Sequence, residues 1–316
     1  MHLWTDLTQV PTDWPASVVT IGVFDGVHRG HRELIRAAVD EAARNALPCV
    51  VMTFDPNPAE VVGHGDPPAR LATLEHRVRL LSELGVDAIV EVPFTKELAQ
   101  WSPERFASEL LRDRFHAATV VVGENFRFGH KAHGDVELLT ELGQELGFVV
   151  DSVHLLAVDG EGDPVSSTAI RNSLADGDVA SAARGLVRPH RVEGVVVRGD
   201  GRGHQLGFPT ANIQTTPYAA IPADGVYAGR MVLDAYGDTR QTLPAAISIG
   251  TNPTFDGVER RIEAFAYDAG DIDLYDKAIA VDFVAKIRDQ QKFNDEQELI
   301  TAVSQDITAA RSILGG

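Results

Sequence analysis

Two histidines, His28 and His31, stand three residues apart in the segment "TIGVFDGVHRGH", residues 20–31. The run before them, "SVVTIGVF", is short, apolar and β-branched, and it predicts a buried strand. The run after them, "RELIRAAVDEAARNA", predicts a helix with one apolar face. Side chains three apart in a helix project from the same side, and the first N–H groups of a helix bind anions. The spacing therefore predicts a phosphate site at a strand–loop–helix junction.

Two further segments of the first half carry polar groups suited to the same site. "VVGENFRFGH" runs from a predicted strand into a loop, and "VSSTAIRNSL" puts hydroxyls and a guanidinium at a helix start, where they suit a phosphate. Ligands of open α/β sheets bind at the carboxyl ends of the strands, so the three segments are expected to meet there. Their candidate residues are Gly22, Asp25, Gly26, Asn125, Ser167, Thr168 and Arg171. Taken alone, Asn125 is equally a turn former, and "SSTAIR" is a helix cap.

The kind of phosphate chemistry is narrowed by what the chain lacks. No G-x-x-x-x-G-K-[ST] motif occurs, so the site is not a P-loop. A histidine pair suits nucleotidyl transfer, in which the enzyme aligns the reactants and neutralises the charge that develops on departing pyrophosphate.

A second group of candidates lies in "GDGRGHQLGFPTANI", where Gly199, Gly201, Gly203 and Gly207 form a flexible turn. Thr210 and Asn212 follow two residues apart, so on an extended segment they face the same side. A hydroxyl and an amide oxygen placed in this way are suitable ligands for Mg²⁺ on a nucleotide. The alternative for this segment is an ordinary strand edge after a turn.

Glu263 lies in "RRIEAFAYD", where it alternates with two aromatic residues. A carboxylate on an aromatic face is either a solvated group at the rim of a barrel or a base with a shifted pKa. The spacing leaves both interpretations open.

The elements that position these residues differ between the two halves of the chain. The first half alternates strand-like and helical runs, which indicates a parallel sheet with helices on both faces. From Arg191 onward the runs are short strands separated by turn residues, which favours an antiparallel barrel or sandwich. A final helix is expected to begin at "NDEQ", with Asn294 as its cap and Gln297 reaching back.

Composition sets limits on the partners. The 316 residues include 28 Lys and Arg against 46 Asp and Glu, a formal charge of −18 that disfavours nucleic acid and anionic membranes. The single cysteine, Cys49, lies in an apolar run and is expected to be a buried core thiol. No disulfide can form within the chain, and we find no signal peptide and no apolar run of membrane-spanning length, which together favour the cytoplasm.

Together these strings resemble the bifunctional riboflavin kinase/FAD synthetase (FMN adenylyltransferase) family of bacteria, over essentially the whole chain. "GVFDGVHRGH", "TFDPNP", "VVGENFRFG" and "SSTAIR" are similar to the motifs of its adenylyltransferase module. "GRGHQLGFPTANI", "DGVYAG", "SIGTNPTF", "IEAF" and "DLY…F…KIR…KF" are similar to those of its riboflavin kinase module.

The resemblance implies a Rossmann-like nucleotidylyltransferase domain over residues 1–186 and a β-barrel kinase domain with a terminal helix over residues 187–316. The kinase would convert riboflavin to FMN with MgATP, and the other domain would convert FMN to FAD with a second ATP, releasing pyrophosphate. The resemblance also assigns roles: His28, His31, Arg171 and the base Glu263 in catalysis; Gly22, Phe24, Asp25, Gly26, Asn57, Ser167, Thr168, Gly201, Gly203 and Gly207 in nucleotide binding; Asn125 and Arg288 in flavin binding; Thr210 and Asn212 in holding the metal.

The chain departs from the family pattern at two positions. The family usually has His where this chain has Asn57, and Gly where it has Asp276. Two other functions are alternatives. A nucleotidylyltransferase with a different acceptor would not need the "PTAN" barrel, and a non-catalytic flavin or nucleotide sensor would not need the polar catalytic residues, which this chain retains.

Overall fold

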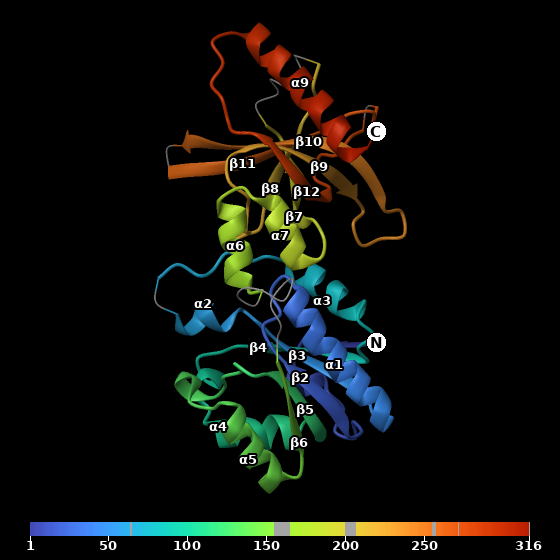
Figure 1. Cartoon of the computed structure of the whole chain (residues 1–316), viewed down its shortest axis with the longest axis vertical. Helices are drawn as coiled ribbons and strands as arrows, with labels where there is room; N and C mark the ends of the chain where they lie inside the picture. Colours follow the sequence, from blue (N-terminus) through green and yellow to red (C-terminus); the bar gives the residue numbers. More distant parts are fainter. Residues whose placement is uncertain (64, 155–164, 200–206, 255–256, 271, 316) are drawn as a thin grey trace. The chain divides into compact units, whose positions relative to one another are not determined.

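The computed structural model describes residues 1–63, 65–154, 165–199, 207–254, 257–270 and 272–315. The chain forms two compact units (Figure 1). The first contains Met1–Pro68 and Leu74–Ser166, and the second contains Ala69–Thr73 and Ser167–Gly316. The first unit is a parallel α/β domain and the second a closed antiparallel barrel with a C-terminal helix, which confirms the predicted fold class.

The first unit is built on a six-stranded sheet in the order β1-β4-β3-β2-β5-β6, in which every pair is parallel. Its central strands are the apolar, β-branched runs of the sequence, since strands covered on both faces need few polar residues. The edge strand β1 was not predicted, because three residues carry too little pattern. The strands are β1 (His2–Trp4), β2 (Ser17–Ile21), β3 (Cys49–Asp55), β4 (Ala88–Pro93), β5 (Ala117–Gly123) and β6 (Val149–Val153).

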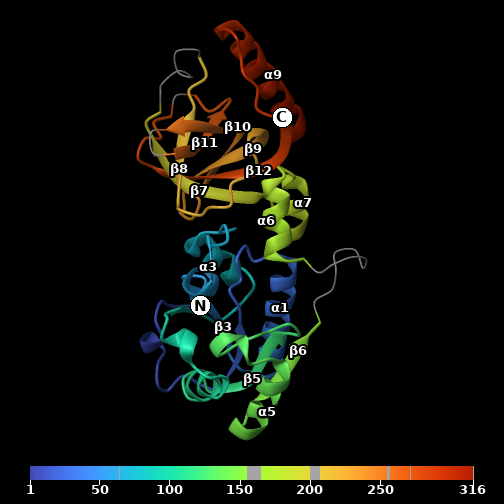
Figure 2. The ribbon, with the colours of Figure 1, turned by 90° about the vertical axis from the view of Figure 1, so that its left-hand side faces the viewer.

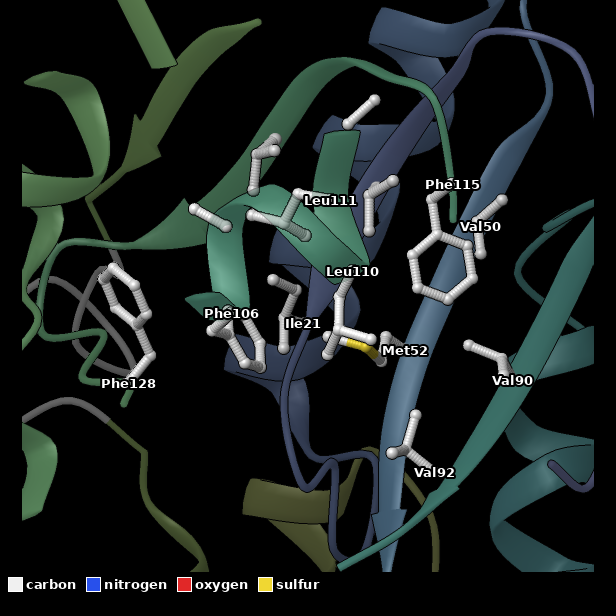
Figure 3. Packing of buried hydrophobic residues seen from close by; sticks show 14 of the residues in the cluster. Ile21, Val50, Met52, Val90, Val92, Phe106, Leu110, Leu111, Phe115 and Phe128 are labelled. Atoms are coloured by element: carbon white, nitrogen blue, oxygen red, sulfur yellow. The ribbon is translucent and has the colours of Figure 1, made fainter. Parts of the chain in front are cut away.

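Helices cover both faces of this sheet, because alternate strand residues point to opposite sides. On one face Val18, Val51 and Val121 pack against α1 and α3. On the other face Ile21 and Met52 join a larger cluster with the chain that follows α4, and Figure 3 shows this packing. The helices are α1 (Arg29–Asn45), α2 (Pro58–Val62), α3 (Leu74–Ser82), α4 (Pro103–Arg105) with a π-helical continuation (Phe106–Arg112), and α5 (Val136–Leu146).

Cys49 is buried in this sheet, as expected, with 1% of its surface exposed. Burial raises the pKa of its thiol to about 12. The residue therefore stays a protonated packing group rather than a nucleophile.

The second unit is a closed barrel in the order β10-β11-β8-β7-β12-β9, in which all neighbours pair antiparallel. Closure leaves no free sheet edge and lets alternate side chains fill the interior. Among the buried interior residues are Tyr227 and Phe283, whose rings meet edge to face at 5.4 Å. The strands are β7 (His190–Val197), β8 (Ala211–Thr215), β9 (Gly225–Leu233), β10 (Gln241–Thr254), β11 (Gly257–Ala266) and β12 (Ala278–Arg288).

The C-terminal helix α9 (Glu296–Leu314) lies along the outside of the barrel (Figure 2), where Ala310 joins a buried cluster with Ala228 and Ala246. Its cap differs from the prediction of Asn294 with Gln297. Asp295 is the N-cap and accepts from the Glu298 N–H at 2.8 Å. The Glu298 side chain reaches back to the N–H of Asn294 at 2.9 Å. The sequence analysis placed the N-cap one residue too early, because both Asn and Asp are good N-cap residues.

Helices α6 (Ser167–Ala175) and α7 (Val179–Leu186) group with the barrel unit. The end of α6 contacts the loop before β9, where the Ala223 N–H donates to the Leu174 carbonyl at 2.9 Å. The division between the compact units therefore falls before α6. The boundary between the two functional domains, expected after α7 at 186/187, stays a prediction. Among the described residues, no helix combines the length and apolar character needed to cross a bilayer.

Candidate active sites

The loop between β2 and α1 has a strained backbone. Phe24, Gly26 and Val27 have φ angles of 52°, 78° and 42°, and for a β-branched residue such as Val27 this left-handed conformation is costly. The buried Phe24 ring folds back over Gly22, where a Cβ would lie 2.9 Å from two ring atoms. Such strain persists where the surrounding structure holds a loop in a working shape.

This loop brings the two histidines together at the start of α1. His28 is the N-cap, and its Nδ1 accepts from the His31 N–H at 3.4 Å. The two rings stack with centroids 3.5 Å apart and an interplanar angle of 18°. Because Nδ1 of His28 accepts, its neutral ring carries the proton on Nε2. The predicted juxtaposition of two imidazoles at a helix N-terminus is therefore present.

His31 is held in its neutral form. Burial, and to a smaller extent the charge of His28, lower its pKa well below the usual 6.5. Its Nδ1 is buried and finds no hydrogen-bond partner in the described part of the chain. An anion close to the ring would oppose both effects and raise the pKa, so this group is suited to respond to a phosphate.

The turn after β3 lies beside this loop, because β2 and β3 are parallel neighbours. Asn57 caps α2 through its Oδ1, which accepts from the Ala59 N–H at 3.0 Å. It follows a cis peptide bond between Asp55 and Pro56. Asn57 is thus a helix cap in this structure, and its amide nitrogen makes no hydrogen bond to the residues described.

Asn125 lies in the turn directly after β5, on the other side of β2, and is exposed to solvent. The segments that follow the central strands β3, β2 and β5 therefore lie at one edge of the sheet, as the sequence analysis expected. A buried arginine at this edge, Arg77 on α3, was missed by the sequence analysis. Its Nη1 donates to the carbonyl of Val23 at 3.0 Å, and its Nη2 to that of Phe54 at 3.2 Å. The sequence carries no clear signal for this burial, because Arg77 shares the run "LEHRVRLL" with Arg79, an ordinary surface arginine.

Ser167, Thr168 and Arg171 lie at the start of α6, in the second unit. The Arg171 Nε donates to the Ala69 carbonyl at 2.6 Å, which ties α6 to the segment 69–73 of the same unit. The structure thus places these three residues together on one helical turn.

The second candidate site lies on the barrel, on strands β8 and β11. Asn212 and Glu263 are direct cross-strand partners in the β8–β11 register. The Thr210 hydroxyl lies 3.5 Å from a carboxylate oxygen of Glu263, at the long limit for a hydrogen bond. The Asn212 amide packs so closely over Gly199 that a Cβ at this glycine would collide with it. The three polar residues therefore converge beside the predicted glycine turn.

The oxygen donors of this cluster fit a magnesium ion. They comprise a hydroxyl, an amide oxygen and a carboxylate, all of which are hard ligands of the kind that Mg²⁺ prefers. No group of three or more His, Cys, Asp or Glu side chains in the described residues could hold a metal on its own. This composition suits a cation that arrives with a nucleotide, since Mg²⁺ is usually held by few protein ligands together with phosphates and water.

Four other positions that the sequence analysis singled out remain to be described. Gly207 has a φ of 84°, a conformation that favours glycine. Gly201 and Gly203 lie outside the described residues. Asp276, where the family usually has glycine, lies in a turn with a φ of 62°. This left-handed conformation favours glycine, and aspartate also adopts it more readily than most residues.

Arg288 occupies the end of β12 and forms a two-pronged ion pair with the buried Asp306 of α9, at 2.8 and 2.7 Å. A third N–H donates to the backbone carbonyl of Asp289 at 3.0 Å. The observed contacts anchor α9 to the barrel, a role that the sequence analysis did not foresee for a predicted flavin-binding residue.

Comparisons with known proteins identify the family of this chain. A family model described as FAD synthetase matches residues 10–169, and one described as riboflavin kinase matches residues 186–314. The bifunctional riboflavin kinase/FMN adenylyltransferase of Escherichia coli K12 is 37% identical over 310 residues, covering 98% of this chain and 96% of that protein. The protein of the same name from Pseudomonas fluorescens is 35% identical over 315 residues, covering 99% and 98%.

A solved structure from Streptococcus pneumoniae, titled a macrolide-efflux protein, has the same fold over 98% of both chains, with a TM-score of 0.87 and 30% identity. The fold, the family models and the full-length relatives all indicate the same family. The chain is a member of the bifunctional riboflavin kinase/FMN adenylyltransferase family.

Proposed function

We propose that residues 1–186 carry out the adenylyltransferase reaction of the family and residues 187–316 the riboflavin kinase reaction. In the first, a phosphate oxygen of FMN attacks the α-phosphorus of ATP, the bond to the bridging oxygen breaks, and pyrophosphate leaves. In the second, the ribityl 5′-hydroxyl of riboflavin attacks the γ-phosphorus of ATP, and ADP leaves.

The stacked pair His28 and His31 supports the first assignment most strongly. The imidazoles and the free N–H groups of the first turn of α1 would hold the triphosphate. Charge that develops on pyrophosphate is then met by donors already in place, which lowers the barrier without a covalent intermediate. His31 is neutral near pH 7, and phosphate charge beside it would raise its pKa, so it is a donor that gains strength as the anion binds.

The remaining candidate residues of this reaction have supporting roles. Gly22, Phe24, Asp25 and Gly26 would shape the loop against the nucleotide, and Asn57 would donate its amide hydrogens. We assign Ser167, Thr168 and Arg171 to closing on the triphosphate, and Asn125 to the flavin side.

Glu263 is the base of the proposed kinase reaction. Its carboxylate would accept the proton of the ribityl hydroxyl as that oxygen attacks. Thr210 and Asn212 would hold the metal and the phosphates, and their convergence with Glu263 supports the assignment. Magnesium bound with ATP would neutralise phosphate charge. The backbone would approach the nucleotide closely at Gly201, Gly203 and Gly207. Arg288 would support flavin binding by anchoring α9 to the barrel.

ATP and FMN as substrates, together with a chain that has one buried cysteine, favour action in the cytoplasm.

The experiment is to incubate the protein with riboflavin and MgATP and to separate the products by chromatography. We expect FMN to appear first and FAD to follow, with one pyrophosphate released for each FAD. A flavin or nucleotide sensor would bind the compounds and leave both unchanged. A nucleotidylyltransferase with another acceptor would leave riboflavin unphosphorylated, and either result would overturn the proposal.

A further inference from the structure

Arg77 is buried, although it lies on α3, a helix that also carries an exposed arginine. Only 6% of its surface is exposed, whereas Arg79 on the same helix keeps 42% of its side chain in solvent and faces Glu83 at 3.8 Å. Burying a guanidinium is costly unless its N–H groups are satisfied and its charge is balanced. The partners of Arg77 must therefore offset the cost of burying its guanidinium.

Those partners are the ends of the two strands that lead into the proposed adenylyltransferase site. The β2–β3 ladder has its last pair at Ile21 and Met52. Val23 and Phe54 each lie two residues beyond that pair, and Arg77 donates to both of their carbonyls, at 3.0 and 3.2 Å. Arg77 thus links the two strands beyond their last paired residues.

Both connected segments carry candidate site residues. The chain beyond Val23 is the strained loop that ends in the histidine pair, and the chain beyond Phe54 forms the turn that holds Asn57. Thr53 gives the Val23 carbonyl a second donor, from its hydroxyl at 3.0 Å. The loop is therefore held at this carbonyl by one charged and one neutral group.

The charge of Arg77 is balanced at the same edge of the sheet. Its Nη2 lies 3.8 Å from a carboxylate oxygen of Asp55. The pKa of Glu91, on β4, is raised, mainly by burial and also by the charge of Asp55, while the charge of Arg77 opposes this and lowers it. Arg77 is thus the cation that faces two carboxylates beside a site proposed to bind a triphosphate.

We propose that Arg77 is a positioning residue of the adenylyltransferase site, which sets the distance between the loop of the histidine pair and the turn of Asn57. The inference rests on the proposed function of that site. Arg77 acts on the reaction through the backbone of the two segments, and a shift of about 1 Å in such a segment can cost about 10²-fold in rate.

The test is Arg77→Lys, with Arg79→Lys as its matched control on the same helix. Lysine keeps the charge but lacks the planar fork that reaches two carbonyls at once. We expect kcat for FAD formation from FMN to fall by about 10²-fold while the KM for ATP changes little. Riboflavin kinase activity of the same samples, and both activities of Arg79→Lys, should stay at the wild-type level.

A double-mutant cycle separates positioning from general destabilisation. Arg77→Lys is combined with His31→Ala, and kcat for FAD formation is measured for all four proteins. If Arg77 acts through the histidine loop, Arg77→Lys lowers this kcat by less than about threefold in the His31→Ala background. Full additivity of the two losses, or an unchanged kcat in Arg77→Lys alone, would overturn the proposal.

Two further outcomes are distinguishable. If His31→Ala alone leaves FAD formation intact, the proposed function of the site fails, whatever Arg77 does. If Arg77→Lys does not fold, Thr53→Val replaces it in the cycle, because it removes the other donor to the Val23 carbonyl without changing any charge. Thr53→Val with unchanged kcat would then count against the inference.

Discussion

The barrel unit should lose stability in mild acid through one buried histidine. His190 is the first residue of β7, and 1% of its surface is exposed. Its Nε2 donates to the Ala220 carbonyl at 2.6 Å, and its Nδ1 is buried without a partner among the described residues. Burial is the main cause that lowers its pKa from 6.5 to about 4.

The size of the effect follows from that pKa difference. In the unfolded chain His190 takes up a proton below about pH 6.5, whereas in the folded barrel it stays neutral down to about pH 4. The unfolded state therefore binds more protons between these values, so stability rises with pH across the window. Lowering the pH from 7.5 to below 4 should remove about 3 kcal/mol of unfolding free energy through this residue, at about 1.4 kcal/mol per pKa unit.

The assay uses a feature of the composition. All three tryptophans lie in the first unit and all five tyrosines in the barrel unit. Urea unfolding followed by tyrosine emission therefore reports on the barrel, and selectively excited tryptophan emission reports on the other unit. The comparison is between the wild type and His190→Gln, because a glutamine amide can still donate to the Ala220 carbonyl and does not titrate.

We expect the stability difference between wild type and His190→Gln to shrink by about 3 kcal/mol between pH 7.5 and pH 4, in the tyrosine signal alone. Carboxylates that titrate in the same range cancel in this comparison. A difference that is independent of pH would refute the reasoning, since it would mean that His190 is protonated equally in both states.

Four further predictions concern the two activities. His31→Ala should lower the rate of FAD formation by about 10²–10³-fold and spare FMN formation, because it removes a donor to developing charge. Glu263→Gln should lower FMN formation by about 10²–10⁴-fold and spare FAD formation from supplied FMN, because the base is lost. Asn57→His should raise the FAD-forming rate, most clearly in mild acid, since a charged donor bonds phosphate more strongly than an amide. Fragment 167–316 should make FMN and unfold at higher urea concentration than fragment 189–316, because α6 and α7 bury Leu and Val side chains worth about 2 kcal/mol each.

Steady-state kinetics of both reactions check the three substitutions, and urea titration with a kinase assay checks the fragments. Loss of both activities in folded His31→Ala or Glu263→Gln would contradict the independence of the two sites. An unchanged FAD rate in Asn57→His at two pH values would show that residue 57 acts only as the cap of α2. Equal stability of the two fragments would show that α6 and α7 add nothing to the barrel.

The sequence was sufficient for features that depend on neighbours along the chain. The alternation of β-branched runs with helical runs predicted the parallel sheet, because strands covered on both faces must be apolar throughout. The short strands after Arg191 predicted an antiparallel barrel or sandwich, and the family resemblance selected the barrel. His28 and His31 were also predictable as a pair, since three residues of spacing at a helix start leave few other places for the two rings.

Local patterns gave less information where several residues satisfy the same rule. The N-cap of α9 is Asp295 and not the predicted Asn294, because both side chains can accept a hydrogen bond from the first turn. β1 escaped prediction because His2–Trp4 is too short to show a period, and it is a strand only through its pairing with β4.

Tertiary structure alone decided the contacts between distant segments. Asn212 and Glu263 became cross-strand partners through the register of β8 and β11, and Arg288 met Asp306 through the packing of α9 on the barrel. Arg77 appears in the sequence as an ordinary helix arginine; its burial and its bridge between two strand ends exist only after α3 packs on the sheet. The physical reason is common to all three: the energy of an ion pair or a buried donor depends on its partners and on the exclusion of water, and neither is encoded within one segment.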